Sequence, residues 1–231
     1  MAELITLANL YNDPNLQEYY QLEDLTGKNG NTLTNNNTVA FSAAKFNNGA
    51  DTGASNTNKS LSIASALGYA GGAYAISFWV KIITEPGVSA NYFLAEVEDD
   101  GTDTILRVYY QNVAGTRQMI FGRFKVGVGE DSFTYASGNL GTSALYHVVV
   151  TYNGITVRGY VNNIDVGNVA ASGSGVSAIS DGFRIFTEST LTDFASAIID
   201  DVALFNRNLT AADVNLIFNG PHVGSMLHMI Q

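Results

Sequence analysis

The sequence predicts an all-β protein, a two-sheet antiparallel sandwich, and three observations lead to this prediction. From residue 39 onward, apolar and polar side chains alternate with a period of two, which is typical of half-buried strands. The dipeptides Asn153-Gly154 and Asn162-Asn163 separate three such stretches and tolerate the positive φ that tight hairpin turns require. With 231 residues, 46% of them hydrophobic, the chain is long enough for one large sandwich domain.

The N-terminal residues follow a different period. Between residues 3 and 11, Leu4, Leu7 and Tyr11 recur at helical spacing, and Asp13-Pro14 ends the run. We therefore expect a short helix within an N-terminal arm of residues 1–15.

Residues 74–83 form the clearest predicted strand, with Ile76, Phe78 and Val80 on one face and Ser77 and Trp79 on the other. Residues 145–152, 155–161 and 164–169 are predicted to form an antiparallel meander. Further strands are expected at residues 39–46, 60–66, 91–98, 104–111, 118–126, 183–187 and 196–205. Glycine and asparagine are frequent in residues 27–37, 47–58 and 171–182, which predicts loops there.

A second short helix is expected near the C-terminus. Thr210 is placed to cap its N-terminus, and Asp213 at the third helical position suits the positive end of the helix dipole. Asn219-Gly220 ends the helix, and Pro221 prevents its continuation. The sandwich is therefore expected to span residues 16–220 and to be followed by a tail of residues 221–231.

Composition narrows the classes of function. The net charge of -10 argues against nucleic acid as a partner, because nucleic-acid binding rests on clustered Lys and Arg. The absence of Cys excludes disulfides and a Cys nucleophile, and no apolar run is long enough to span a membrane. No secretory signal is visible at the N-terminus, so an extracellular or virion-surface location is expected to depend on another export route or on lysis.

Five segments resemble the laminin G-like domains of the concanavalin A-like lectin and glucanase superfamily, above all their bacterial and phage versions. They are residues 18–31 (EYYQLEDLTGKNGN), 75–81 (AISFWVK), 146–154 (YHVVVTYNG), 160–163 (YVNN), and 199–214 (IDDVALFNRNLTAADV). The resemblance covers about residues 16 to 219. It implies a jelly-roll order of strands, with the first and last strands as neighbours.

The resemblance also implies a metal site, because several family members hold Ca²⁺ between the first and last strands. Asp24 and Asp200 are the candidate ligands, and the loop after Asp24 offers carbonyl oxygens, which suit this hard cation. Structural calcium is therefore one hypothesis. The alternative is that Asp200 accepts backbone N–H bonds from the loop of residues 24–31.

Catalysis is not expected. Some members of the superfamily are glucanases, and the carboxylates of residues 96–100 (EVEDD) are the nearest equivalent of their catalytic strand. They lack the Glu-x-Asp-x-x-Glu type of spacing and precede a turn, so a solvated strand end is expected. His147 is expected to be a core residue, and no Gly-x-Ser-x-Gly motif occurs.

Tyrosines provide the clue to binding. On alternation, Tyr109 shares a face with Arg107 and Gln111, and Tyr160 shares a face with Arg158. Such rings can cover the C–H faces of a sugar while amide and guanidinium groups bind its hydroxyls. The alternative is that these side chains only stabilise an exposed sheet face.

Two functions follow as hypotheses. The first is a non-catalytic recognition module for a glycan or a cell-surface polymer, which rests on fold analogy. The second is a structural or decoration protein of a virion or surface filament, with capsid or tail proteins as partners. In that case the apolar terminal segments would make subunit contacts and allow a homo-oligomer.

Overall fold

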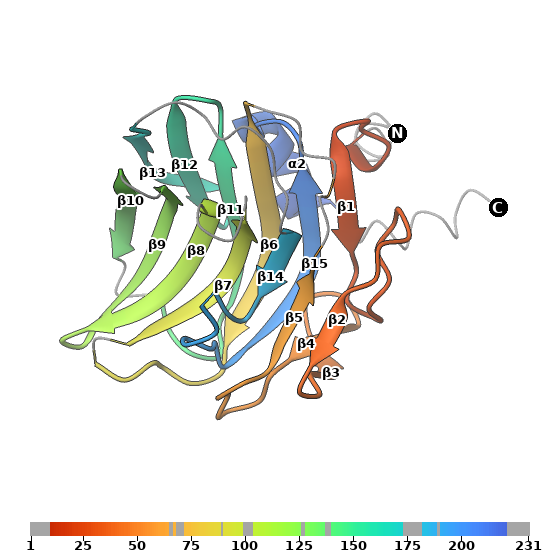
Figure 1. Ribbon diagram of the computed structural model, residues 1–231, viewed down its shortest axis with the longest axis vertical. Coiled ribbons are helices and arrows are strands. Elements are labelled where there is room, and N and C mark those ends of the chain that lie inside the picture. The colour runs from red at the N-terminus through yellow and green to blue at the C-terminus, as the bar shows by residue number, and fades with distance from the viewer. Residues whose placement is uncertain are drawn as a thin grey trace.

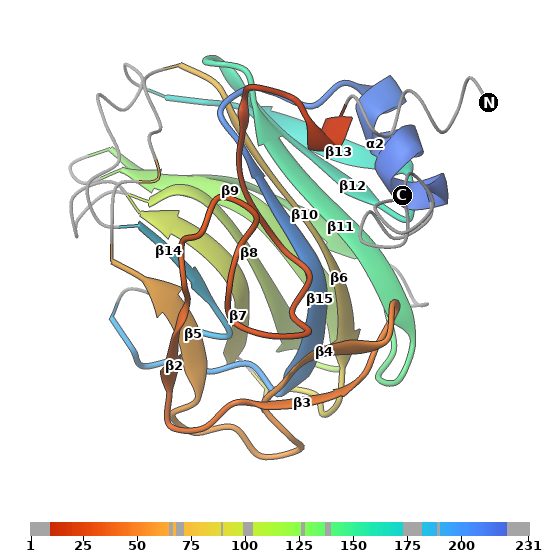
Figure 2. The same ribbon diagram turned by 90° about the vertical axis from the view of Figure 1, so that its right-hand side faces the viewer.

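Two curved antiparallel sheets face each other across an apolar core (Figure 1). The computed structural model describes residues 10–64, 67, 72–88, 90–98, 104–125, 128–136, 140–172, 182–188 and 190–220. Figure 2 shows the two layers from the side, with helix α2 (Ala211–Asn219) outside one of them. The predicted β-sandwich is therefore confirmed.

The first sheet has eight strands, and seven of them follow one path in the order β13 (Ile164–Ala170), β12 (Thr156–Val161), β11 (Leu145–Tyr152), β6 (Tyr74–Ile82), β15 (Ala197–Phe205), β4 (Asn48–Asp51) and β3 (Ala40–Ala43). The eighth, β1 (Leu16–Tyr20), also pairs with β15. The second sheet has seven strands in the order β10 (Gly129–Ala136), β9 (Thr116–Lys125), β8 (Thr104–Val113), β7 (Asn91–Glu98), β14 (Gly182–Ile185), β5 (Ser60–Ile63) and β2 (Thr34–Asn36).

The first and last strands are neighbours, as the family resemblance implies. Strand β15 pairs along one edge with β6. Its other edge is shared, because β4 pairs with Ile198 and Ile199 while β1 pairs with the stretch from Val202 to Phe205. The N-terminal strand is thereby held beside the last strand of the chain.

Turns and caps follow the local sequence closely. Asn162 and Asn163 have φ of 50° and 66°, as a two-residue hairpin turn requires, and Gly154 has φ of 98°. At the start of α2, the Thr210 side chain accepts the N–H of Asp213 and the Asp213 side chain accepts the N–H of Thr210, which forms a capping box. Neither α2 nor any other helix in the described part is long and apolar enough to cross a membrane.

Some short strands fall where the sequence predicts loops. Strand β2 (TNN) lies within the predicted loop 27–37, and β4 (NGAD) lies within the predicted loop 47–58. Neither segment alternates, so pairing with β5 and β15 decides their conformation. Strand β10, which no predicted element covered, pairs with β9 along its whole length. The predicted N-terminal helix lies mostly outside the described residues, which show helix at Leu10 and Tyr11.

The central strands β6 and β15 of the eight-stranded sheet are buried on both faces, which simple alternation does not predict. The inner face of this sheet contributes to the main core, with Ile76, Phe78 and Val80 fully buried. Its outer face forms a second apolar cluster beneath α2 and the N-terminal segment, made of Leu10, Leu16, Tyr19, Ala75, Val149, Tyr160, Ala203, Phe205, Leu209 and Val214. Alternation therefore predicts correctly which side chains face inward and which face outward. It does not predict that α2 and the N-terminal segment cover the outer face.

His147 lies in this covered outer layer, which confirms the prediction that it is a core residue. Its ring is fully buried and contacts Trp79, with the ring centroids 5.0 Å apart, and Phe218 of α2, with the centroids 5.8 Å apart. Its Nε2 atom and the Ser77 hydroxyl are hydrogen-bonded at 2.9 Å, and its Nδ1 atom has no hydrogen-bond partner among the described residues. Burial, with a smaller contribution from the positive charge of Lys45, lowers the pKa of His147 to about 3.

Glu18 of β1 anchors the loop that follows this strand. Its carboxylate is fully buried and accepts the backbone N–H of Asn29 and the side-chain amide of Asn31, both at 2.7 Å. The loop passes so close that a Cβ atom at Gly27 would lie 2.4 Å from the Glu18 carboxyl carbon. A buried carboxylate without such donors would be costly, so this pairing fixes the loop against β1.

We expect the stability of the protein to fall as the pH falls from 7 to 5. The pKa of His147 is near 6.5 in the unfolded chain and about 3 in the folded protein, so only the unfolded chain takes up a proton in that range. The expected loss from this residue is about 2 kcal/mol at pH 5. Thermal unfolding of the wild type and of His147→Gln, followed across this range, measures it. Parallel declines of the two proteins would contradict the assignment.

We also expect Glu18→Gln to destabilise the protein by about 1–3 kcal/mol, because a neutral amide offers one acceptor oxygen where three N–H groups donate to the carboxylate. The matched control is Glu23→Gln. Glu23 also accepts one backbone N–H and one side-chain amide, both from Asn48, but it does so at an exposed position. Denaturant unfolding of both variants checks the difference, and an equal loss in the control would contradict the special role of Glu18.

Candidate functional site

The residues that the sequence selects for sugar binding lie on opposite faces of the sandwich. Arg107, Tyr109 and Gln111 of β8 alternate with core residues and project from the outer face of the seven-stranded sheet. Arg158 and Tyr160 of β12 project from the outer face of the eight-stranded sheet, where Tyr160 joins the second apolar cluster. Because packed sheets lie about 10 Å apart, these two groups do not form one site.

Arg107 and Tyr109 of the β8 group mainly contact neighbouring side chains on the same sheet face. Arg107 forms an ion pair with Glu130 at 2.7 Å, and the Tyr109 hydroxyl donates to the same carboxylate at 3.3 Å. Burial and the charge of Glu130 raise the pKa of Tyr109 to about 12. The Arg107 guanidinium also lies 5.6 Å from the centre of the Tyr109 ring and 5.8 Å from that of Phe93. These contacts agree with the alternative of a stabilised sheet face.

The β12 group lines a separate surface pocket of about 160 Å³. Arg158 pairs there with Asp165, and Tyr160 and Asn208 also line the pocket. Both partners of the ion pair are partly exposed, so the pair contributes little to stability. Sugar binding stays a prediction for both groups. These residues are Arg107, Tyr109 and Gln111 on β8, and Arg158 and Tyr160 on β12.

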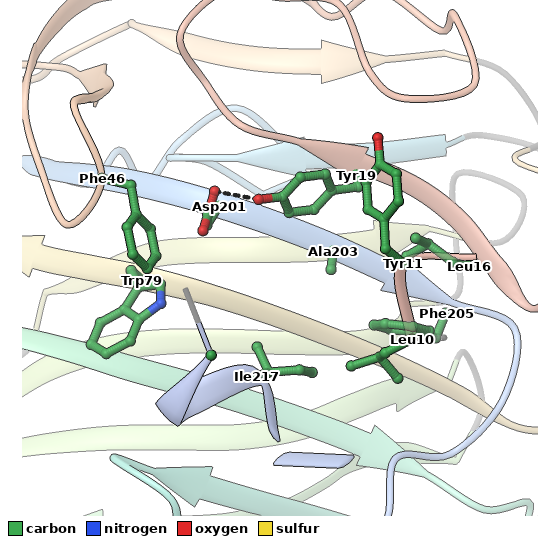
Figure 3. Close-up of a pocket in the computed structure, with 11 residues that line it drawn as sticks. Leu10, Tyr11, Leu16, Tyr19, Phe46, Trp79, Asp201, Ala203, Phe205 and Ile217 are labelled. Atoms are coloured by element: carbon green, nitrogen blue, oxygen red, sulfur yellow. Dashed lines mark hydrogen bonds between the residues drawn. The ribbon is translucent and has the colours of Figure 1, made fainter. Parts of the chain in front are cut away.

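A different group of aromatic residues encloses a cavity of about 50 Å³ on the outer face of the eight-stranded sheet, here called the aromatic pocket. Figure 3 shows Phe46 and Trp79 on one side of it and Tyr11 and Tyr19 on the other. Ala203 of β15 lies between these walls. The remaining lining residues are Leu10, Leu16, Asp201, Phe205, Ile217 and Gly220. The pocket is mostly apolar, and Asp201 supplies the one carboxylate of its lining.

That carboxylate is placed by a β-bulge. The register between β15 and β6 shifts by one residue between Asp200 and Ala203, and Asp201 takes a left-handed φ of 50°. The bulge lets two consecutive acidic residues find separate donors. Asp200 accepts the backbone N–H of Phe46 at 2.8 Å, and Asp201 accepts the Tyr19 hydroxyl at 2.6 Å.

The Tyr19–Asp201 hydrogen bond has a fixed polarity. Burial, followed by the negative charge of Asp201, raises the pKa of the Tyr19 phenol well above its usual value. The phenol therefore remains protonated at physiological pH and donates its hydrogen to the Asp201 carboxylate. A carboxylate has about four lone-pair sites, so Asp201 can accept a further donor from a ligand.

Another pocket, here called the polar pocket, adjoins the aromatic pocket and shares Tyr11 and Tyr19 with it. Its volume is about 190 Å³, and its other lining residues are Gln21, Glu23, Asp24, Thr26, Gly27 and Lys28. The Lys28 Nζ atom lies 4.4 Å from the centre of the Tyr11 ring and donates to the Tyr11 carbonyl, which orients the ring. The two pockets together offer an apolar slot beside a hydrogen-bonding surface.

Local sequence patterns do not reveal this site. Alternation correctly places Trp79 on the outer face, but Tyr11, Tyr19 and Phe46 come from segments with no alternation that links them to β6. The one local signal is the pair Asp200-Asp201 in an otherwise apolar strand, which is unusual enough to indicate a bulge or a bound group.

The predicted calcium ligands have different surroundings. Asp24 is exposed and accepts the N–H of Thr26 at 2.7 Å, whereas Asp200 is buried and binds the N–H of Phe46. The loop of residues 24–31, expected as the donor to Asp200, instead donates to Glu18 from Asn29. In the described ranges no three His, Cys, Asp or Glu side chains are grouped to hold a metal. Calcium binding stays a prediction, and an unchanged melting temperature in EDTA would overturn it.

The expectation of a solvated strand end at residues 96–100 is wrong for the described part. Glu96 and Glu98 are 1% and 2% exposed, and the Glu98 carboxylate pairs with Arg184 of the neighbouring strand β14. Burial arises because long side chains from β8 and β14 lie beside them on the same face, as the register Arg184–Glu96–Arg107 shows. Asp99 and Asp100 lie outside the described residues.

Comparison with known proteins identifies the fold. The Laminin_G_3 family model, described as the concanavalin A-like lectin/glucanases superfamily, matches residues 48–215. No curated protein sequence matches the chain. Domain 4 of AbnA, a GH43 extracellular arabinanase from Geobacillus stearothermophilus solved with arabinotriose, is similar with a TM-score of 0.63 and 17% identity over 87% of this chain and 98% of that domain.

Toxin domains have the same fold. The botulinum neurotoxin serotype G binding domain has a TM-score of 0.65 and 14% identity over 88% of this chain. The binding domain of Paraclostridial Mosquitocidal Protein 1 has a TM-score of 0.69 and 13% identity over 89% of this chain. The chain spans about half of each of these two domains, 50% and 52% respectively. At such identities the likeness concerns the fold alone.

Proposed function

The chain belongs to the concanavalin A-like lectin/glucanases superfamily, and we propose that it is a non-catalytic module that binds a glycan or a cell-surface polymer. The proposed site is the aromatic pocket together with the adjoining polar pocket. The partner is a carbohydrate chain outside the cell or on a surface, as the sequence analysis also expects.

One observation carries this proposal: aromatic rings, a carboxylate and a polar surface meet at one place. Tyr11 and Tyr19 belong to both pockets, and Asp201 accepts a hydrogen bond at the edge of the apolar one. Sugars present apolar C–H faces and hydroxyl groups side by side, so they need apolar rings and hydrogen-bonding groups at close range.

The structural relatives support a binding role but do not indicate a particular ligand. The arabinanase domain was solved in complex with arabinotriose, and the toxin domains are binding domains. Fold similarity alone does not transfer a ligand, so the identity of the glycan is argued from the pockets.

The surroundings of the carboxylates support the absence of catalysis. A glycosidase needs two carboxyl groups that flank the scissile bond and reach it freely. Here Glu98 is held by Arg184, and both Glu98 and Glu96 are covered. We expect no release of reducing ends from glycans that the protein binds, and a reducing-sugar assay on those glycans checks this.

The second hypothesis, a virion or filament component that assembles through apolar termini, stays a prediction. Residues 1–9 and 221–231, which it invokes, lie outside the described residues. That hypothesis requires an oligomer in solution, and light scattering on the full-length protein measures the mass that tests it.

We expect a glycan array to identify at least one ligand, and we expect Ala203→Leu to weaken its binding about ten-fold or more. The added side chain fills the aromatic pocket without removing a polar group. Trp79, the single Trp of the chain, lines this pocket, so its fluorescence reports occupancy directly.

Tyr109→Ala and Arg158→Ala are the controls, because they change the residues that the sequence selects on the two other surfaces. Each should change affinity by less than about two-fold. If they abolish binding while Ala203→Leu does not, the site lies at those residues. An array without any ligand, with and without Ca²⁺, would overturn the proposed function.

A further inference from the structure

We propose that this site selects an N-acetylated sugar, with the acetamido group in the aromatic pocket and the sugar ring in the polar pocket. The inference rests on the proposed function and names the class of sugar. It follows from the sizes of the two pockets, from the chemistry of their walls and from the charges beside them.

The sizes of the pockets match the two parts of such a sugar. One water molecule needs about 10–15 Å³ of cavity volume. The aromatic pocket, at about 50 Å³, therefore has room for roughly three to five heavy atoms. An acetamido group has about four, whereas a pyranose ring with its hydroxyls has about a dozen and exceeds this space. The polar pocket, at about 190 Å³, has room for about a dozen or more.

The walls of the aromatic pocket suit both ends of an acetamido group. Phe46, Trp79 and Ala203 offer carbon surfaces for the methyl group, which gains from removal from water. The Asp201 carboxylate, at the polar edge, can accept the amide N–H alongside the Tyr19 hydroxyl. A plain hydroxyl in the same position would leave the apolar part of the pocket empty.

Charges of both signs lie beside the two pockets. The Nζ atom of Lys45 lies 4.3 Å from the centre of the Trp79 ring, and that of Lys28 lies 4.4 Å from the centre of the Tyr11 ring. Asp201, Glu23 and Asp24 offset these two positive charges, so the preference for the acetylated form rests on the fit of the methyl group to the apolar walls. The net charge of -10 and the Asp201 carboxylate disfavour a strongly anionic sugar.

The polar pocket supplies partners for the hydroxyl groups of the ring. Gln21, Thr26 and Lys28 offer donors, and Glu23 and Asp24 offer acceptors. Tyr11, which faces both pockets, lies where the acetamido group would join the ring. The arrangement therefore binds the acetamido group and the ring at the same time.

Three trisaccharides that differ only at the second carbon of each ring test this inference: chitotriose, its fully deacetylated form, and cellotriose. Binding is measured by Trp79 fluorescence and by calorimetry on the full chain. We expect chitotriose to bind about ten-fold or more tightly than the other two. Ala203→Leu should reduce this preference to less than about three-fold, and Tyr109→Ala should leave it unchanged.

Asp201→Asn is the second variant, because it keeps the shape of the side chain if Ala203→Leu disturbs folding. It should also weaken chitotriose binding, since a neutral amide is a poorer acceptor than a carboxylate. Circular dichroism and melting curves confirm the fold of each variant.

The outcomes separate this inference from the proposed function. Equal binding of chitotriose and cellotriose, with both weakened by Ala203→Leu, would overturn the inference and leave the glycan site in place. Tightest binding of the deacetylated form, or an array ligand without an acetamido group, would also overturn it. If no array glycan and none of the three trisaccharides binds, the proposed function fails as well.

Discussion

Strand β15 sets the constraint on which the rest of the structure depends. It is buried on both faces and paired along both edges, and within Ala197–Phe205 all residues but Asp201 are buried. Two acidic side chains in such a strand are costly unless each finds a donor. The bulge between Asp200 and Ala203 meets this need, because it directs one carboxylate to the N–H of Phe46 and the other to the hydroxyl of Tyr19.

The same bulge organises the candidate site. It falls where the edge of β15 that faces away from β6 changes partner from β4 to β1, so the segments before and after the bulge have different neighbours. Phe46, next to β4, therefore stands on one side of Ala203, and Tyr19 of β1 stands on the other. Helix α2 covers the layer, and Phe218 stacks on Trp79 with the ring centroids 5.6 Å apart. The aromatic pocket thus results from the way in which a buried strand accommodates its own charges.

Particular residues show how far the sequence predicts the site. Alternation places Arg107, Tyr109 and Gln111 on an outer face, and it does the same for Arg158 and Tyr160. It does not indicate that β8 and β12 belong to different sheets, because a period of two relates residues within one strand only. The burial of Glu96 and Glu98 was missed for a similar reason, since their cover comes from the side chains of neighbouring strands.

The sequence by itself determined the sandwich fold, most long strands, the Asn-rich hairpin turns and the capped helix α2. Each of these depends on local periodicity or on the dihedral preferences of a few adjacent residues. The tertiary structure decided which strands share a sheet, how the outer face of the eight-stranded sheet is covered and where the aromatic pocket lies. Those features join residues as distant as Tyr19 and Asp201, and their contact depends on strand pairing over the whole chain rather than on any local pattern.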